Sequence, residues 1–439
     1  MKKRELLQGT VSDYTYDGMG VVKVDNFTYF VRGVLLHEEI EFLVLKRNKK
    51  LGYGKVERIL KESVHRITPS CPYYPKCGGC HIMHMDYEAQ LDFKHRIVKQ
   101  NIQNIGKLDI EVRKPLTSNT SHYRNKAQFP VQGHPFAMGF YRQRSNDLVD
   151  IDTCLVQSEL IDTIYAELRA IKNTSFVDDV RHVLIKHAFV SGEVMVAFIM
   201  RKDHKEEIAA FIKPLLDRYP IVSLLQNINT RNDNVILGDH IDVIDGKAYI
   251  VEELDGLKFQ VSLHSFFQIN PKQTIHLYNE AIKAANITNE DKVIDLYCGV
   301  GSITLFLARQ AKHVTGVEIV APAIENAKIN QQLNQMDNVT FICSDAGTYA
   351  DKVASSKNYP DVVFVDPPRK GLDTLTIEST VKMQPRTIAY ISCNPATLAR
   401  DIAIYKEHGY TCEYVQPVDM FPNTYHIECV ILMTITDGC

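Results

Sequence analysis

Short apolar runs separated by amphipathic stretches recur from about residue 260 onward, and this alternation constrains the fold more than any other feature. The runs cover residues 293–297, 313–317, 339–342, 362–365 and 388–391. Runs of this length are typical of strands buried on both faces, and the stretches between them, such as residues 303–309, are typical of covering helices. The sequence therefore predicts a doubly wound, Rossmann-like α/β sheet.

The first 60 residues follow another pattern. Residues 9–12, 20–24, 28–31 and 39–45 are short β-type stretches, and turn residues such as Asp17-Gly18 separate them. We therefore expect a small OB-like β-barrel, a fold that often binds nucleic acid but does not prove that function.

The middle of the chain mixes both patterns, with apolar strands expected at residues 194–199 and 221–225. A central α+β region should therefore separate the barrel from the sheet. We predict three domains, which cover residues 1–60, 61–260 and 261–439.

The composition is that of an ordinary soluble protein, with 45% hydrophobic and 23% charged residues. No apolar stretch has the length of a membrane helix, and the basic residues 1–4 precede no long apolar core, so we expect a cytoplasmic protein. Residues 1–160 carry 24 Lys and Arg against 18 Asp and Glu, although the whole chain has a net charge of -3. The densest basic run, residues 46–58, fits either a solvated surface or a strip that contacts phosphates.

A glycine-containing turn follows the first strand of the predicted sheet. Residues 295–301 (DLYCGVG) end that strand and open a helix, and Gly299 lets the backbone approach a ligand there. Glu318 ends the next strand, where a carboxylate can bridge ribose hydroxyls. Thr304 replaces the third glycine of a dinucleotide site, which disfavours NAD and favours S-adenosylmethionine. Asp345, after the third strand, can accept a hydrogen bond from the adenine amine, although surface aspartates are common.

A thiol and a carboxylate follow two further strands of the predicted sheet. Cys393 comes after residues 388–391, and Asp366 comes after residues 362–365. Carboxyl ends of parallel strands meet at one edge of a sheet, so we expect both side chains at one site. A free cysteine is as readily a small buried hydrophobe as a nucleophile, so its neighbours must decide.

Methylation of uracil at C5 would give this thiol a role. C5 is only weakly nucleophilic, and a thiolate that adds to C6 raises its electron density. A general base must then remove the C5 proton. We predict Cys393 as the nucleophile and Glu428 as the base; His426, on the same predicted strand, is the alternative base.

Three further cysteines lie close together in the sequence. Cys71, Cys77 and Cys80 occupy a turn-rich segment, and Cys154 is the best candidate for a fourth ligand. A reducing compartment favours metal ligands or free thiols over disulfides. Four cysteines can hold zinc or an iron–sulfur cluster, and the spacing does not separate the two.

Several motifs together resemble one enzyme family. Residues 366–371 (DPPRKG), 392–395 (SCNP) and 426–428 (HIE), in that order behind residues 295–301, are similar to the RNA 5-methyluridine methyltransferases. The likeness covers essentially the whole chain. It implies S-adenosylmethionine-dependent methylation of uracil C5, with Cys393 as nucleophile and Glu428 as base. The cofactor contacts that it implies are Gln268, Tyr297, Glu318, Asp345 and Asp366.

The resemblance also bears on the cysteines and the substrate. Larger members with an N-terminal barrel of the TRAM type carry a [4Fe-4S] cluster on four cysteines that match Cys71, Cys77, Cys80 and Cys154. Within the family, the combination of a barrel and a cluster implies 23S rRNA as the substrate, and tRNA is the alternative. The target uridine must be flipped out or lie in a loop, and no obligate protein partner is inferred.

Other functions are less consistent with these residues. Asp366-Pro367-Pro368 resembles a motif of amino-group methyltransferases, but that chemistry has no use for Cys393. A non-enzymatic iron–sulfur RNA-binding protein would not need the acidic residues and the thiol of the sheet. Residues 123–126 and 140–144, where cations and rings alternate, fit RNA contacts or solvated charge. Cys429 and residues 437–439 match no motif of the family.

Overall fold

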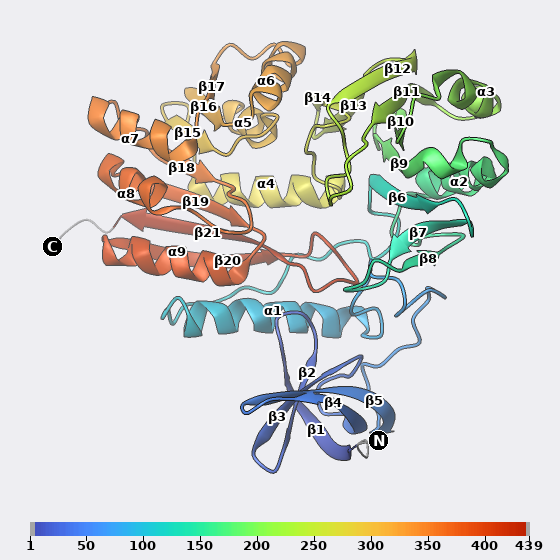
Figure 1. Cartoon of the computed structure of the whole chain (residues 1–439). Coiled ribbons are helices and arrows are strands. Elements are labelled where there is room, and N and C mark those ends of the chain that lie inside the picture. The colour runs from blue at the N-terminus through green and yellow to red at the C-terminus, as the bar shows by residue number, and fades with distance from the viewer. Residues whose placement is uncertain (1–4, 436–439) are drawn as a thin grey trace.

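The computed structural model describes residues 5–435, which form a small barrel, a central sheet and a helix-covered C-terminal sheet (Figure 1). The basic residues 1–4 and the unmatched residues 437–439 lie outside the described part of the chain. The predicted fold class, a mixed α/β architecture with an N-terminal barrel, is confirmed. The division at residues 60 and 260 stays a prediction.

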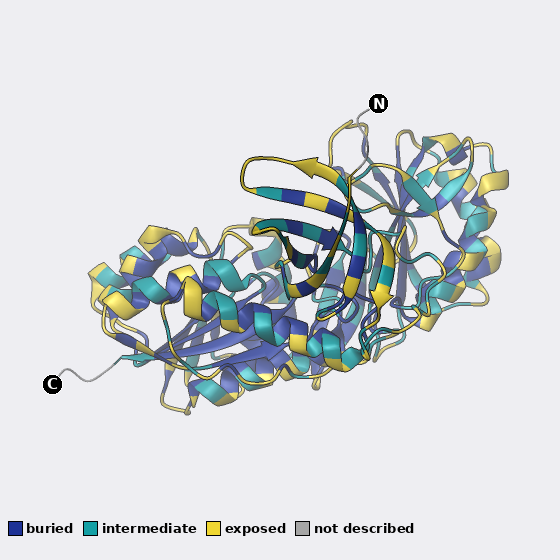
Figure 2. Ribbon diagram, turned by 90° about the horizontal axis from the view of Figure 1, so that it is seen from below, coloured by how far each residue is buried: buried dark blue, intermediate teal, exposed yellow. Residues whose placement is uncertain are grey.

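The N-terminal barrel is closed, with the strand order β1-β2-β3-β5-β4. Its strands are β1 (Leu6–Tyr14), β2 (Gly20–Val24), β3 (Phe27–Arg32), β4 (Glu39–Arg47) and β5 (Leu51–Lys61). Buried and exposed residues alternate along these strands in the view of Figure 2. The inward residues, among them Val11, Val22 and Phe42, form a core of their own.

Strand β5 was not predicted, because glycines replace the apolar residues that would mark its inward face. A Cβ atom on Gly52 would lie 2.6 Å from the ring of Tyr29, and one on Gly54 would lie 2.4 Å from the ring of Phe42. Only glycine lets the strand pass so close to these rings. The charges of β5 point outward, and Arg58 pairs there with Glu41 at 3.0 Å, as expected of a solvated surface.

The central sheet has the order β12-β11-β10-β9-β6-β7-β8. Its strands are β6 (Lys126–Gln132), β7 (Ala137–Tyr141), β8 (Leu148–Asp150), β9 (Val180–His187), β10 (Val194–Met200), β11 (Ile221–Ile228) and β12 (His240–Gly246). Helices α2 (Glu159–Leu168) and α3 (Lys205–Leu216) pack on it, and the short helices η1 (Arg169–Asn173) and η2 (Val177–Asp179) follow α2. A hairpin, β13 (Tyr249–Leu254) and β14 (Leu257–Ser262), leads to the next sheet.

The C-terminal sheet has the order β17-β16-β15-β18-β19-β21-β20. Its strands are β15 (Lys292–Leu296), β16 (His313–Glu318), β17 (Val339–Cys343), β18 (Val362–Val365), β19 (Thr387–Ser392), β20 (Tyr410–Val418) and β21 (Glu428–Ile435). Strands β15 to β19 are parallel, whereas β21 is antiparallel to both of its neighbours. The helices are α4 (Pro271–Ala285), α5 (Ser302–Ala308), α6 (Ala321–Leu333), α7 (Ala346–Ser356), α8 (Thr374–Met383) and α9 (Pro395–Glu407).

Helix α1 (Tyr87–Asn104) lies between the barrel and the C-terminal sheet (Figure 1). On one side its Phe93 packs edge-on against Tyr14 of the barrel, with ring centroids 5.3 Å apart. On the other side its Val98 and Ile102 join the apolar core of the C-terminal sheet. The helix therefore connects the barrel to the edge of the sheet that carries β20. Among the described residues no helix has the length and apolar character needed to cross a membrane.

Candidate active site

The strand register places two predicted catalytic residues next to each other. Ser392, the last residue of β19, pairs with Cys429 of the antiparallel strand β21. Cys393 directly follows β19 and Glu428 directly precedes Cys429 on β21, so the two residues lie next to each other where the ladder ends. Asp366 follows the neighbouring strand β18, so three predicted side chains meet at one end of the sheet.

The local sequence around Cys393 fixes the turn that presents the thiol. The side chain of Asn394 accepts a hydrogen bond from the backbone N–H of Ala396 at 3.1 Å and so caps α9, whose first residue is Pro395. Proline is favoured at that position because it needs no hydrogen-bond partner there. The strand thus ends at the cysteine, and the helix begins directly after it.

Cys393 opens into a cavity of about 460 Å³. Burial, together with Glu428 and Asp366, raises the pKa of its thiol to about 11, and the guanidinium of Arg369 opposes this shift. A neighbouring carboxylate disfavours the thiolate, so the thiol and Glu428 resist being ionised at the same time.

Glu428 and His426 have different surroundings. Glu428 is 5% exposed, and burial together with Asp366 raises the pKa of its carboxyl well above the ordinary value. His426 accepts a hydrogen bond at Nδ1 from Arg369 at 3.0 Å, and burial beside that cation lowers its pKa to about 3. Its acceptor nitrogen is therefore already used, which leaves Glu428 as the better proton acceptor.

A sharp turn of the backbone follows β15. Tyr297 and Gly299 have φ values of +71° and +54°, and a Cβ on Gly299 would meet no atom within 4 Å. The backbone therefore turns sharply and exposes its surface at this point. Glu318 accepts hydrogen bonds from the N–H groups of Gly299 at 3.2 Å and Val320 at 2.9 Å. This carboxylate is held beside the turn, where ribose hydroxyls would bind.

The other predicted cofactor residues follow β17 and β18 or precede α4. Asp345 is exposed and caps α7 through Oδ1, which accepts from the N–H of Thr348 at 3.0 Å. Burial raises the pKa of Asp366 to about 7. Gln268 lies in the segment before α4, and its backbone carbonyl accepts a hydrogen bond from the side-chain amide of Asn125 at 3.4 Å.

Asp295 belongs to the glycine-turn motif but was not predicted as a site residue. It is fully buried at the end of β15, and its Oδ2 accepts a hydrogen bond from Thr304 at 2.5 Å. Oδ1 has no partner among the described residues, and burial raises the pKa of the carboxyl to about 7. Asp295 Oδ1 can therefore accept a further hydrogen bond beside the glycine turn. The sequence signal that could have identified Asp295 is its place as an acidic residue just before the glycine turn.

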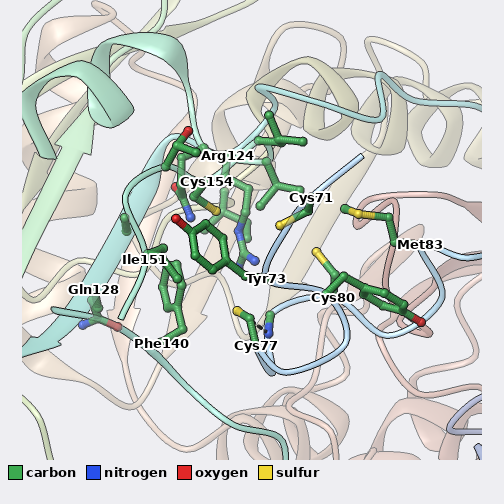
Figure 3. A pocket seen from close by; sticks show the side chains of 18 of the residues that line it. Cys71, Tyr73, Cys77, Cys80, Met83, Arg124, Gln128, Phe140, Ile151 and Cys154 are labelled. Carbon is green, nitrogen blue, oxygen red and sulfur yellow. Dashed lines mark hydrogen bonds between the residues drawn. The ribbon is translucent and has the colours of Figure 1, made fainter. Parts of the chain in front are cut away.

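The four candidate metal ligands line a single cavity of about 230 Å³. Their sulfur atoms point toward the same space, which lies between the turn of residues 71–80 and Cys154 (Figure 3). Burial raises the pKa of Cys77, Cys80 and Cys154, and the neighbouring cysteines contribute to each shift. The structure thus unites cysteines that are more than 70 residues apart in the sequence.

The cavity also contains basic residues. Arg124 and Lys126 line it, and Nε of Arg124 has no partner among the described residues. Such a donor fits an anionic group, and four thiolates with an iron–sulfur core form one. Within residues 5–435 no group of three or more His, Cys, Asp or Glu is arranged to hold a metal ion. The prediction of an RNA contact at residues 123–126 is wrong for Tyr123, which is only 3% exposed.

Cys429 is part of the apolar core rather than of the site. It is fully buried and belongs to the apolar core that includes residues of α1 and α9. Successive strand residues face opposite sides, so Cys429 points away from the side that Glu428 occupies.

The strand order, the glycine turn after β15 and the acidic residue at the end of β16 together define a class I S-adenosylmethionine-dependent methyltransferase fold. A free cysteine beside a buried glutamate, at the same end of the sheet, distinguishes this site from a simple nucleoside-binding site. The chain belongs to the tRNA (uracil-5-)-methyltransferase family, whose model matches residues 86–436. It is thus an RNA methyltransferase of the uracil-C5 type, and the alternatives of amino-group methylation and of a non-enzymatic protein no longer apply.

Individual relatives extend the likeness beyond the matched range. An uncharacterised RNA methyltransferase of Listeria monocytogenes is 40% identical over 99% of this chain and 98% of its own length. One of Clostridium tetani is 42% identical over 95% and 94%. Among solved structures, a Pyrococcus abyssi tRNA (uracil-54, C5)-methyltransferase in complex with S-adenosyl-L-homocysteine superposes with a TM-score of 0.77 and 26% identity. The superposition covers 97% of this chain and 99% of that one.

Proposed function

We propose that this enzyme methylates C5 of a uridine in 23S rRNA, with S-adenosylmethionine as methyl donor, Cys393 as nucleophile and Glu428 as base. One observation supports the assignment: β19 and β21 pair Ser392 with Cys429, the residues directly before Cys393 and directly after Glu428. Glu318, at the end of β16, and Asp366, after β18, lie along the same edge of the sheet.

The residues divide the chemistry between them. The thiolate of Cys393 forms a bond to C6, and the electron pair of the C5–C6 double bond moves toward the C4 carbonyl, so C5 becomes nucleophilic. S-adenosylmethionine supplies an electrophilic methyl group for C5. The carboxylate of Glu428 then takes the C5 proton, the double bond forms again and the bond between sulfur and C6 breaks.

The cofactor would be held by residues on several strand ends. Glu318 is proposed to bind the ribose hydroxyls, and Asp345 the adenine amine, through the oxygen that does not cap α7. Tyr297 and Gly299 are proposed to contact the cofactor at the turn after β15, and Gln268 and Asp366 to contact it from the segment before α4 and from the end of β18.

The choice of 23S rRNA rests on the combination of barrel and clustered cysteines. The Pyrococcus abyssi tRNA enzyme shares almost the whole architecture, so tRNA is the second candidate. The test incubates the protein with labelled S-adenosylmethionine and transcripts of 23S rRNA and tRNA, and then maps 5-methyluridine. We expect the label in 23S rRNA; label in tRNA alone would reverse the choice of substrate.

We also propose a [4Fe-4S] cluster on Cys71, Cys77, Cys80 and Cys154, with a structural role because methyl transfer needs no redox step. Support comes from the shared cavity and from the buried, unpartnered Nε of Arg124. A zinc ion on the same four cysteines is the alternative, because four thiolates can hold either group.

The cluster can be tested by composition. Protein purified without oxygen should contain about four iron and four sulfide per chain. Cys154→Ser should lower both, whereas Cys343→Ser should not, because Cys343 is exposed at the end of β17. Zinc in place of iron, or equal iron in both variants, would refute the assignment.

A further inference from the structure

The cavity of Cys393 has a wall that comes from the N-terminal barrel. Tyr16, in the turn between β1 and β2, lines this cavity together with Cys393. Its side chain is 70% exposed, so the ring is open to a ligand at the mouth of this cavity. The proposed chemistry at Cys393 and Glu428 does not use this residue.

A row of rings leads from Tyr16 toward the thiol. The ring of Tyr16 meets Tyr425 edge-on at 6.5 Å, and Tyr425 lies 4.4 Å from His426. His426 in turn accepts the hydrogen bond of Arg369, the cation next to Cys393. Tyr16 is therefore separated from the reacting thiol by two rings and stands farther out along the cavity.

The turn that carries Tyr16 is held rigidly. The N–H of Thr15 donates to the carbonyl of Met19 at 2.8 Å, and the N–H of Gly18 donates to the carbonyl of Thr15 at 3.0 Å. Gly18 has a φ of +76°, and a Cβ there would lie 3.1 Å from Ile82 of the cysteine-bearing segment. The turn thus packs tightly against its neighbour, so little conformational entropy remains to be lost when a ligand binds.

Positive charge is fixed at the residue that follows Tyr16 in the sequence. Asp17 is 6% exposed and accepts hydrogen bonds from Arg32 at 3.1 Å and from Arg144 at 2.9 Å. Two guanidinium groups on one carboxylate leave a net positive charge next to Tyr16. An exposed ring beside cationic side chains is the pattern that single-stranded nucleic acids bind, because bases stack on the ring and phosphates neutralise the cations.

We propose that Tyr16 contacts RNA directly and that its ring stacks on the base next to the target uridine. The target itself must reach Cys393, two rings farther in, so the residue at the outer end meets a neighbouring nucleotide. The barrel then contributes to substrate selection at the active site and not only through its outer surface. This inference rests on the proposed function, because it presumes a uridine at Cys393.

The chain contains no tryptophan, so Tyr16→Trp introduces a unique fluorescent reporter. The probes are transcripts of 23S rRNA and of tRNA that contain 5-fluorouridine, whose C5 fluorine cannot be removed as a proton and therefore traps the covalent adduct. Stacking should lower the emission at least about twofold as the adduct forms. A matched control, Tyr359→Trp, alters a tyrosine that is 38% exposed outside this cavity, and its emission should not change.

Kinetics give a second readout. Tyr16→Ala should raise the KM for RNA about tenfold and leave the KM for S-adenosylmethionine unchanged, whereas Tyr16→Phe, which keeps the ring, should behave as the unaltered enzyme. Unchanged emission of Tyr16→Trp while the adduct forms, or an unchanged RNA KM in Tyr16→Ala, would overturn this inference alone. Failure of the unaltered enzyme to form any adduct would overturn the proposed function, and this inference with it.

Discussion

A buried ion pair holds the segment that leads to Glu428, the proposed base. Lys94 of α1 donates to Asp419 Oδ1 at 2.5 Å and to the carbonyl of Phe421 at 3.1 Å. Both charged side chains are 0% exposed. Tyr87 adds a hydrogen bond of 2.9 Å to Asp419 Oδ2. The segment between β20 and β21, which ends at Glu428, is therefore fixed to α1.

Lys94→Met should release this segment, because it leaves Asp419 charged and buried without its cation. Removal of one partner of a buried pair costs about 3–5 kcal/mol, and the remaining hydrogen bond from Tyr87 favours the lower value. About 3 kcal/mol corresponds to roughly a hundredfold change in an opening equilibrium. We therefore expect amide hydrogens of residues 418–428 to exchange about a hundredfold faster, with a matching loss of methylation.

The assay is hydrogen exchange followed by mass spectrometry of peptides from the folded protein. Lys99→Met is the matched control, because Lys99 lies on the same helix but is exposed. Adding Asp419→Asn to Lys94→Met should restore part of the protection, since an amide needs no counter-charge. Exchange in Lys94→Met within about threefold of the unaltered protein would refute the view that this pair fixes the catalytic segment.

Two further predictions concern the thiol and the glycine turn. Burial raises the pKa of Cys393 to about 11, so its thiolate is the minor form at neutral pH. The single-turnover rate of adduct formation with 5-fluorouridine RNA should therefore rise from pH 7 to pH 9, and a rate that does not change with pH would contradict this. In Gly301→Ala the new side chain would have to adopt a φ of +82°, and its Cβ would lie 2.6 Å from the ring of Phe341. Calorimetry should therefore show a loss of about 1–3 kcal/mol in stability and weaker binding of S-adenosylmethionine. Gly192→Ala, with a φ of +75° and open space around it, should keep the binding intact.

The sequence predicted those parts of the fold that depend on local pattern. Continuous apolar runs such as β18 mark strands buried on both faces, and Asn394-Pro395 marks a strand end followed by a helix start. Strand β5 was missed because the residues that face the barrel core include Gly52 and Gly54, which carry no apolar signal.

The candidate site was predictable where each residue lies at a strand end. What local pattern does not contain is pairing over long distances. The register that brings Cys393 next to Glu428 depends on an antiparallel strand at the far end of the sequence. The contact between Lys94 and Asp419 joins residues 325 positions apart, and the place of Tyr16 depends on the packing of the barrel against α1.

The central claim is that Cys393 and Glu428 perform successive covalent and proton-transfer steps on uridine. The most direct measurement follows covalent RNA adducts and 5-methyluridine side by side in Cys393→Ala and Glu428→Ala. The account predicts neither adduct nor product in Cys393→Ala, and a methylated adduct that accumulates without release in Glu428→Ala. Turnover to 5-methyluridine by Cys393→Ala would contradict it.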